Sequence, residues 1–171
     1  SLNAGSLWGR PFYILREAWN ILNAIAEGKI ESGDEKKLNA LKGETMAVIA
    51  LCQFDLTRCF GYPYTKDNGA SLGAPLIDHL VGTYENPSRS TVAQAYDFII
   101  ETLEEAVTLM SEEKNNGRMN KYAARALLAR VYLYHNDNRK AFDMAEQLIK
   151  DVDASGSYAL YPHEKYVAAW S

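Results

Sequence analysis

The sequence predicts a mainly α-helical protein of antiparallel helix pairs, interrupted by one long irregular loop near residues 62–89. Apolar side chains recur at steps of three and four along most of the chain, which is the period of an amphipathic helix. Short stretches of Asn, Asp and Gly separate the periodic runs and are typical of turns. The 171 residues, 47% of them hydrophobic, suffice for one compact domain, which we expect to span residues 1–171.

The first two helices are predicted at about residues 12–27 and 35–60. Gly28 follows the first helix, and Gly61 follows the second at the position where a left-handed glycine commonly ends a helix. The loop at 62–89 contains three of the five prolines, so we expect extended or turned backbone there and find almost no support for strands. A loop of this length often contributes to function.

A third helix is predicted at about residues 91–112. Thr91 and Gln94 stand at the spacing of a capping box, and Pro87 discourages an earlier start. Acidic residues gather on one face of this helix and apolar residues on the other. The helix is therefore expected to pack through a single apolar face.

Two further helices are predicted to form an antiparallel hairpin. Asn120 is placed to cap the run KYAARALLARVYLYH. Residues 136–138 then make so short a link to RKAFDMAEQLIKD that the two helices must be neighbours. The alanines of the first run favour helix and allow an adjacent helix to approach closely.

Charge and hydropathy exclude several classes of protein. The net charge is −4 and no cluster of Lys and Arg could neutralise a row of phosphates, so nucleic acid is not an expected partner. No apolar run approaches the ~20 residues that a transmembrane helix needs. The chain opens at Ser1 without a leader, so any targeting sequence must lie upstream, and localisation is not readable from these residues.

No catalytic or metal-binding motif is evident, and we expect neither an enzyme nor a cofactor. His79, His135 and His163 are scattered, and each is interpreted as a surface or packing residue. Cys52 and Cys59 lie on one predicted helix, about 10 Å apart along its axis, which is too far for a disulfide. Both are interpreted as small apolar core residues without a metal role.

The predicted hairpin at residues 118–153 is similar to a tetratricopeptide repeat of about 34 residues. With Ala141 set at the small position of the second repeat helix, Leu128, Ala129 and Tyr132 fall on the leucine, small and tyrosine positions of that repeat. Arg125 stands where the repeat usually has Trp, so a plain helical hairpin is also compatible with the pattern.

Five phrases extend the resemblance over most of the chain, in a fixed order: ETMAVIALCQFDLTRCFGYPYT, LGAPLID, RSTVAQAYDFIIETLEEAVTLM, GRMNKYAARALLARVYLYHNDNRKAFDMAEQLIKD and SYALYPHEKY. In these phrases the chain resembles the SusD-like (RagB/SusD) family over about residues 8–168. Asp55 and Arg58 match a recurrent Asp and Arg of the first phrase, at the spacing of a helical ion pair.

That resemblance implies a function. Members of the family are non-catalytic, glycan-binding outer-membrane lipoproteins of Bacteroidetes, built on a tetratricopeptide-like scaffold. They present oligosaccharide to a TonB-dependent, SusC-like transporter for nutrient uptake. The chain is therefore expected to be a fragment of a longer cell-surface protein, held at the membrane only by a lipid anchor outside these residues. The resemblance does not say which glycan is bound.

Candidate carbohydrate-binding residues are aromatic side chains with polar neighbours, because sugars present flat C–H faces flanked by hydroxyls. Tyr84 and Asn86 form such a cluster in the long loop, although the same residues also suit an ordinary turn. Tyr62 and Tyr64 flank a proline that should direct the two rings to different sides, so that one packs while the other is exposed. Trp8 either docks the start of the first helix or contacts a ligand.

Two interpretations of different class remain. The first is a scaffold that captures glycan, and the ordered phrases favour it. The second is a general helical-repeat adaptor, whose concave face would hold a peptide or protein without sugar affinity. A glycosidase would need a pair of carboxylates at a suitable separation, and the sequence offers no specific pair.

Overall fold

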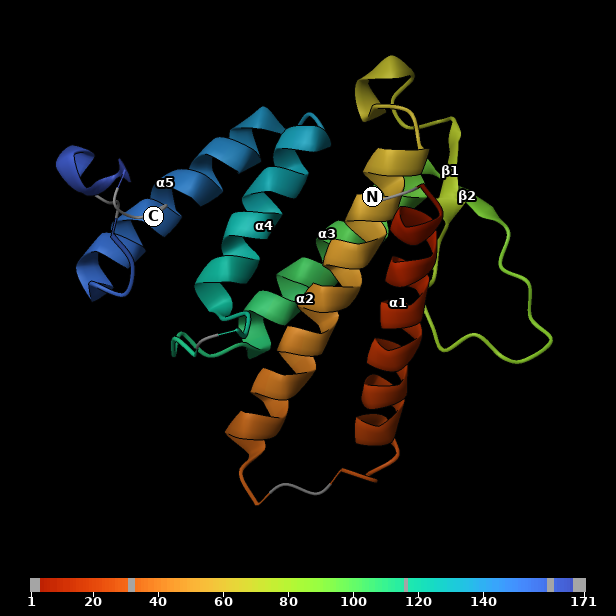
Figure 1. Cartoon of the computed structure of the whole chain (residues 1–171), viewed down its shortest axis with the longest axis horizontal. Coiled ribbons are helices and arrows are strands. Elements are labelled where there is room, and N and C mark those ends of the chain that lie inside the picture. Colours follow the sequence, from red (N-terminus) through yellow and green to blue (C-terminus); the bar gives the residue numbers. More distant parts are fainter. Residues whose placement is uncertain (1–3, 31–32, 116, 160–161, 168–171) are drawn as a thin grey trace.

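The structure is a computed structural model that describes residues 4–30, 33–115, 117–159 and 162–167. In this part of the chain each helix packs on the next, from the first to the fifth, and the helices at the two ends of the row lie far apart (Figure 1). The predicted mainly helical fold of antiparallel pairs is confirmed. The α-helices are α1 (Ala4–Ala26), α2 (Glu35–Phe60), α3 (Val92–Leu109), α4 (Lys121–Tyr134) and α5 (Asn138–Ser155).

Helix ends follow the predicted local signals in most places. The Thr91 hydroxyl accepts from the Gln94 amide at 3.1 Å and the Gln94 side chain accepts from the Thr91 amide at 2.9 Å, which completes the capping box of α3. The Asn120 side chain accepts from the amide of Ala123 at 3.0 Å and caps α4. Helix α2 has the predicted bounds, whereas α3 ends at Leu109, three residues early.

Helix α1 begins earlier than predicted, at Ala4, and continues through Pro11. A proline inside a helix loses one backbone hydrogen bond, so the sequence favoured a later start. The ring of Trp8 lies 5.0 Å from Phe12 and 4.7 Å from Phe60, measured between centroids. These edge-to-face contacts stabilise the additional turns at the start of α1, because Trp8 packs on Phe60 at the end of α2.

Gly61 ends α2 for a different reason than predicted. Its φ is −110°, so the residue is extended and not left-handed. A Cβ at this position would lie 2.7 Å from the Thr57 carbonyl oxygen and 3.0 Å from a methyl of Val92. Glycine is required here because the backbone packs closely. Gly28, after α1, does have the left-handed φ of 68° that its position predicts.

The long loop contains a small hairpin that the sequence did not predict. Strands β1 (Leu72–Pro75) and β2 (Arg89–Thr91) pair antiparallel, with an irregular register between them. Neither strand is long enough to display an alternating pattern, and Pro75 argues against a strand. Two short 3₁₀ turns, Tyr64–Lys66 and His163–Lys165, complete the described elements, while residues 160–161 of the last family phrase lie outside the described part.

The core has two parts that meet at α2. One part joins α2, α3, α4 and the start of α5, and it buries Leu128, Tyr132 and Ala141 at their predicted repeat positions. The other part joins α1, α2 and the hairpin region through residues such as Leu15, Ile49, Leu56, Ala74 and Ile77.

The two cysteines are both free, but only one is in the core. Cys52 is buried, as predicted, whereas Cys59 is exposed, which corrects its interpretation as a core residue. The difference follows from helical geometry, because seven residues leave Cys59 near the end of α2, where fewer elements cover the helix. None of the described helices is long and apolar enough to cross a bilayer.

Candidate functional site

A recess with apolar walls separates α1 from the loop that joins β1 to β2, residues 76–88. The recess has a volume of about 410 Å³. Arg16 and His79 add charged groups to a lining that is otherwise apolar. The apolar lining residues are Trp8, Phe12, Pro75, Ile77, Val81 and Pro87.

A second, more polar recess of about 600 Å³ adjoins the first, because His79 and Pro87 line both. We refer to the two recesses together as the α1–loop cleft. One end of the cleft offers aromatic and aliphatic surface, and the other offers hydrogen-bonding groups. The polar lining residues of the second recess are Glu85, Asn86, Ser88, Arg89, Ser90 and Gln94.

Two helix residues hold the start of the loop against α1 and α2. The fully buried Gln53 donates to the Pro75 carbonyl at 3.1 Å and accepts from the Ile77 amide at 3.3 Å. The indole of Trp19 donates to the Ile77 carbonyl at 3.1 Å. Sequence reasoning missed both residues. The available signal was a lone Gln within the apolar run IALCQF of α2, where a buried amide needs partners.

The far part of the loop is closed by a hydrogen-bonded histidine. His79 Nδ1 lies 2.6 Å from a carboxylate oxygen of Asp78, and its Nε2 lies 2.7 Å from one of Glu85. The second oxygen of Glu85 accepts from the Gly82 amide at 3.1 Å. Hydrogen bonds to the carboxylates of Asp78 and then of Glu85 raise the pKa of His79 above its ordinary value. The Gly82 amide and then His79 lower the pKa of Glu85.

The structure brings two of the predicted binding residues into this cleft. Trp8 lies in the apolar wall and Asn86 lies in the polar recess. Tyr84 is 96% exposed in the loop, between Gly82 and Asn86, and is not among the residues that line either recess. The predicted aromatic and polar cluster is therefore split between the cleft and the open surface.

The two tyrosines around Pro63 do point to different environments, as predicted. Tyr64 packs its ring against Tyr96 at 5.6 Å and His135 at 4.3 Å, measured between centroids. Tyr62 is exposed, and the ammonium of Lys66 lies 3.0 Å from its ring centroid. Neither tyrosine is among the residues that line the α1–loop cleft.

The predicted ion pair at the end of α2 is present. Arg58 donates to Asp55 at 2.6 Å and lies over the ring of Phe54, 4.8 Å from its centroid. Hydrogen bonds from Arg58 and Arg130 lower the pKa of Tyr134 on α4. The pair therefore belongs to the packing of α2 beside α4, with no contact to the cleft among the interactions described.

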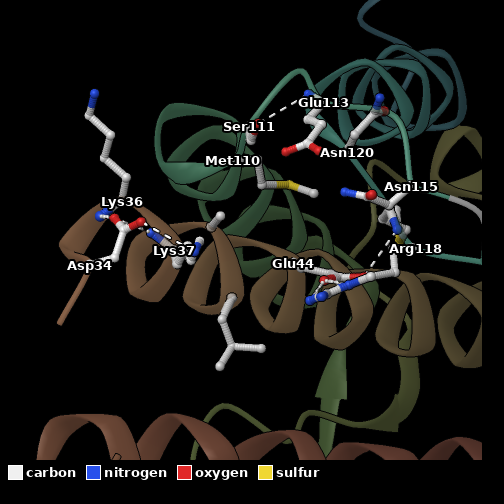
Figure 2. A pocket seen from close by; sticks show the side chains of 13 residues that line it. Asp34, Lys36, Lys37, Glu44, Met110, Ser111, Glu113, Asn115, Arg118 and Asn120 are labelled. Carbon is white, nitrogen blue, oxygen red and sulfur yellow. Dashed lines mark hydrogen bonds and ion pairs between the residues drawn. The ribbon is translucent and has the colours of Figure 1, made fainter. Parts of the chain in front are cut away.

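A third pocket, of about 580 Å³, lies between the first half of α2 and the segment that precedes α4 (Figure 2). Several of its charged groups are already paired. Glu44 accepts from the Arg118 side chain at 2.9 Å and from the Met119 amide at 3.1 Å, and Asp34 accepts from the Lys36 amide at 3.0 Å. No aromatic side chain of the described residues lines this pocket, so it offers no stacking surface for a sugar.

The chemistry of the α1–loop cleft suits a neutral, partly apolar ligand. Aromatic and proline surface can cover the C–H face of a sugar ring, while amide and hydroxyl side chains can pair with its hydroxyls. Arg16 and Arg89 are already engaged, by Glu17 at 2.8 Å and by the Gly73 carbonyl at 2.7 Å. Within the described residues, no group of three or more His, Cys, Asp or Glu side chains could hold a metal ion.

Comparison with known proteins gives a family and several similar structures. Residues 3–133 match the model of a family named SusD-like and described as starch-binding and associating with the outer membrane. No curated protein matches the chain.

Solved structures share the fold over almost all of the chain. A SusD superfamily protein from Bacteroides vulgatus ATCC 8482 is 95% identical over 99% of the chain, with a TM-score of 0.96. Another from Bacteroides thetaiotaomicron VPI-5482 is 41% identical over 93%, with a TM-score of 0.88. A laminarin binding SusD-like protein, 23% identical over 84% with a TM-score of 0.69, shows the fold alone. The chain spans only 38%, 34% and 29% of these three proteins.

Proposed function

Because the chain belongs to the SusD-like family, we propose that it binds oligosaccharide at the cell surface for nutrient uptake, as the helical part of a longer protein. The family description joins starch binding to association with the outer membrane, and this supports both the ligand class and the location. The same membership supports the prediction that the chain is not an enzyme, because the family is one of binding proteins.

The observation that favours this function most is the composition of the α1–loop cleft. Trp8 and Asn86 were predicted from residue type alone, they are far apart in the sequence, and they line two recesses that share His79 and Pro87. A sugar needs both surfaces at once, an apolar face for its C–H groups and polar groups for its hydroxyls. Two adjoining recesses fit a ligand of at least two sugar units.

The partner and the anchor are proposed from family membership alone. We propose that the longer protein is held by a lipid anchor outside this chain and delivers its ligand to a TonB-dependent, SusC-like transporter. Co-purification of the intact protein with an outer-membrane transporter would support the proposed partner. This test does not depend on where the sugar binds.

Calorimetric titration of the chain with malto-oligosaccharides, and then with oligosaccharides of other linkages, tests the ligand class. Saturable binding of one class is expected. Asn86→Ala should weaken it severalfold, because an exposed amide is lost without disturbing the core. Trp8→Leu should weaken it more, because the ring surface is lost while apolar bulk remains.

Tyr62→Ala is the matched control, because Tyr62 is an exposed tyrosine outside the cleft. Tyr84→Ala decides whether the exposed ring beside the cleft contributes. Equal weakening by Tyr62→Ala and Trp8→Leu would contradict the placement of the site. Silence of every sugar would contradict the function.

One observation favours the helical-repeat adaptor as a second candidate. Leu133, Phe142 and Ile149 on α4 and α5 are 57%, 60% and 61% exposed, although each is large and apolar. Phe142 and Ile149 stand seven residues apart and so share one face of α5. Exposed apolar side chains on one face are typical of contacts with other protein segments. This surface is compatible with both candidates, because contact there does not exclude a sugar in the cleft.

A further inference from the structure

The outer part of the β1–β2 loop is shaped by one side chain. His79 contacts Asp78 on one side of its ring and Glu85 on the other, at 2.6 and 2.7 Å. Glu85 in turn binds the amide of Gly82, whose carbonyl accepts from the Glu85 amide at 3.1 Å. The loop from residue 78 to residue 85 is thus folded back around the imidazole.

The same loop forms the outer wall of the α1–loop cleft. Val81 and Pro87 line the apolar recess, Glu85 and Asn86 line the polar recess, and His79 lines both. Gln53 and Trp19 hold residues 75 and 77, but the hydrogen bonds that they make do not reach beyond Ile77. Beyond Ile77, Val81 packs against the core part that includes Leu15 and Ile77, and the hydrogen bonds of His79 and Glu85 hold the turn from residue 78 to residue 85.

We propose that His79 is a positioning residue, which holds the β1–β2 loop as the wall of the α1–loop cleft when its imidazole is protonated and releases it when the imidazole is neutral. The link to ligand affinity rests on the proposed function, whereas the effect on the loop does not.

The geometry gives the direction of this dependence. Only the imidazolium has a proton on both nitrogens, so only it can donate to Asp78 and Glu85 together. A neutral ring would present a lone pair to one of the two carboxylates, and that contact would be lost. The contacts are therefore present below the pKa of His79 and disappear as the pH rises through it.

Other charged groups near the imidazole come from two further elements. Arg16 of α1 lines the apolar recess and Arg89 of β2 lines the polar recess, and neither cation is among the causes of the pKa shift of His79. Arg16 is paired with Glu17, and the Arg89 guanidinium donates to two backbone carbonyls. The two adjacent carboxylates dominate, and the pKa of His79 is raised accordingly.

The first test needs no ligand. The ring carbons of His79 and the backbone amide of Gly82 are followed by NMR in the chain from pH 5 to pH 9. We expect His79 to titrate above the usual value of about 6.5. The Gly82 amide nitrogen lies 3.1 Å from a carboxylate oxygen of Glu85. The chemical shift of the Gly82 amide proton should therefore change with pH at the same midpoint as His79. Titration of His79 at or below the usual value, or a Gly82 signal that does not follow it, would overturn the proposal.

Two variants separate a positioning role from a general effect of pH. Glu85→Gln replaces one carboxylate by a neutral amide, so the midpoint of His79 should fall and the shift of Gly82 should no longer track it. His163→Asn is the matched control, because His163 is an exposed histidine in a different element and should leave both signals unchanged.

The second test measures malto-oligosaccharide affinity on either side of the His79 midpoint. Affinity should fall about twofold to fivefold at the higher pH, the range that exposed ion pairs provide. Glu85→Gln should abolish that pH dependence. If the loop titrates and sugar binds equally well at both pH values, the loop is not the wall of the site and the proposal fails. If the loop titrates and no sugar binds at any pH, the proposed function fails while the role of His79 in the loop stands.

Discussion

Gln53 connects the long loop to the helices through a single side-chain amide. It is fully buried and pairs with two backbone groups that lie 22 and 24 residues along the chain. Residue type and helical period cannot reveal such partners, because they depend on where a distant loop lies. Trp8 and Asn86 were found from residue type because exposed aromatic and amide groups are the groups that a sugar needs. The sequence therefore predicted two residues that line the cleft, but not the residues that hold the adjoining loop in place.

Gln53→Leu should destabilise the chain by about 1–3 kcal/mol, because the Pro75 carbonyl and the Ile77 amide would be left unpaired. Urea unfolding followed by circular dichroism measures the change. Gln147→Leu is the control, because Gln147 is exposed and binds only Asp151 among the contacts described. Its effect should stay within about 0.5 kcal/mol. Equal effects of the two changes would contradict the role of Gln53.

The two cysteines should differ in reactivity. Burial, with a smaller contribution from the charge of Asp55, raises the pKa of Cys52 to about 11. The thiolate is the reactive form, so Cys52 should resist alkylation at pH 8 while the exposed Cys59 reacts. Mass spectrometry after brief iodoacetamide treatment should find a single labelled cysteine in the folded chain and two in urea. Rapid labelling of Cys52 in the folded chain would contradict its burial.

At the scale of elements, the sequence predicted the helices better than anything else. Local signals decide many helix ends: the capping box of α3 and the cap of α4 follow them, whereas Gly61 ends α2 because of close backbone packing. The start of α1 was wrong because the contact of Trp8 with Phe60 outweighs the local effect of Pro11. Strands β1 and β2 were missed because each is short and is stabilised by its partner. Their pairing depends on contacts such as that of Arg89 with the Gly73 carbonyl at 2.7 Å.

The capping box of α3 gives a prediction at this scale. Thr91→Ala removes the hydroxyl that accepts from the Gln94 amide, and it should cost about 1 kcal/mol of stability in urea unfolding. Thr108→Ala, near the other end of the same helix, is the control, because its hydroxyl only donates to the Glu105 carbonyl on the surface. If Thr91→Ala lowered the free energy of unfolding no more than Thr108→Ala does, the cap would not stabilise α3.

The pairing of α4 with α5 should depend on acid pH. Arg125 donates to Asp151 at 2.6 Å, and this contact, followed by one from Gln147, lowers the pKa of Asp151. A carboxyl group with a lowered folded-state pKa stabilises the fold above its unfolded value of about 3.9 and loses that contribution as the pH falls through the folded value. Asp151 binds a proton more readily in the unfolded chain than in the folded chain, so the stability that it contributes falls as the pH falls.

The unmodified chain should therefore be more stable than Asp151→Asn at neutral pH, and the difference should shrink toward zero in acid. Thermal unfolding at a series of pH values measures it. Asp153→Asn, an exposed aspartate on the same helix, should differ little from the unmodified chain at any pH. A constant difference for Asp151→Asn would show that its effect is not electrostatic.

At the scale of the whole molecule, α1 and the two strands lie at one end of the row of helices, and α5 lies at the other (Figure 1). The cleft is lined from α1 and the β1–β2 loop, whereas the exposed apolar side chains Leu133, Phe142 and Ile149 belong to α4 and α5. Helix α2 separates them, because both parts of the core meet on it. This arrangement allows ligand binding and contacts with other protein segments to occupy different surfaces. The fold class followed from the helical period, but the cleft could not be predicted, since it forms only where α1 meets a loop that begins 50 residues after the end of that helix.

The most direct test of the central claim maps the ligand on the folded chain. Amide and indole signals are followed by NMR while malto-oligosaccharide, and then other oligosaccharides, are added. We predict that one sugar class shifts the Trp8 indole together with the amides of Val81 and Asn86, saturably, while Tyr62 and the residues around Glu44 do not respond. Shifts confined to the pocket around Glu44 or to α5, or no shift with any sugar, would contradict binding of glycan in the α1–loop cleft.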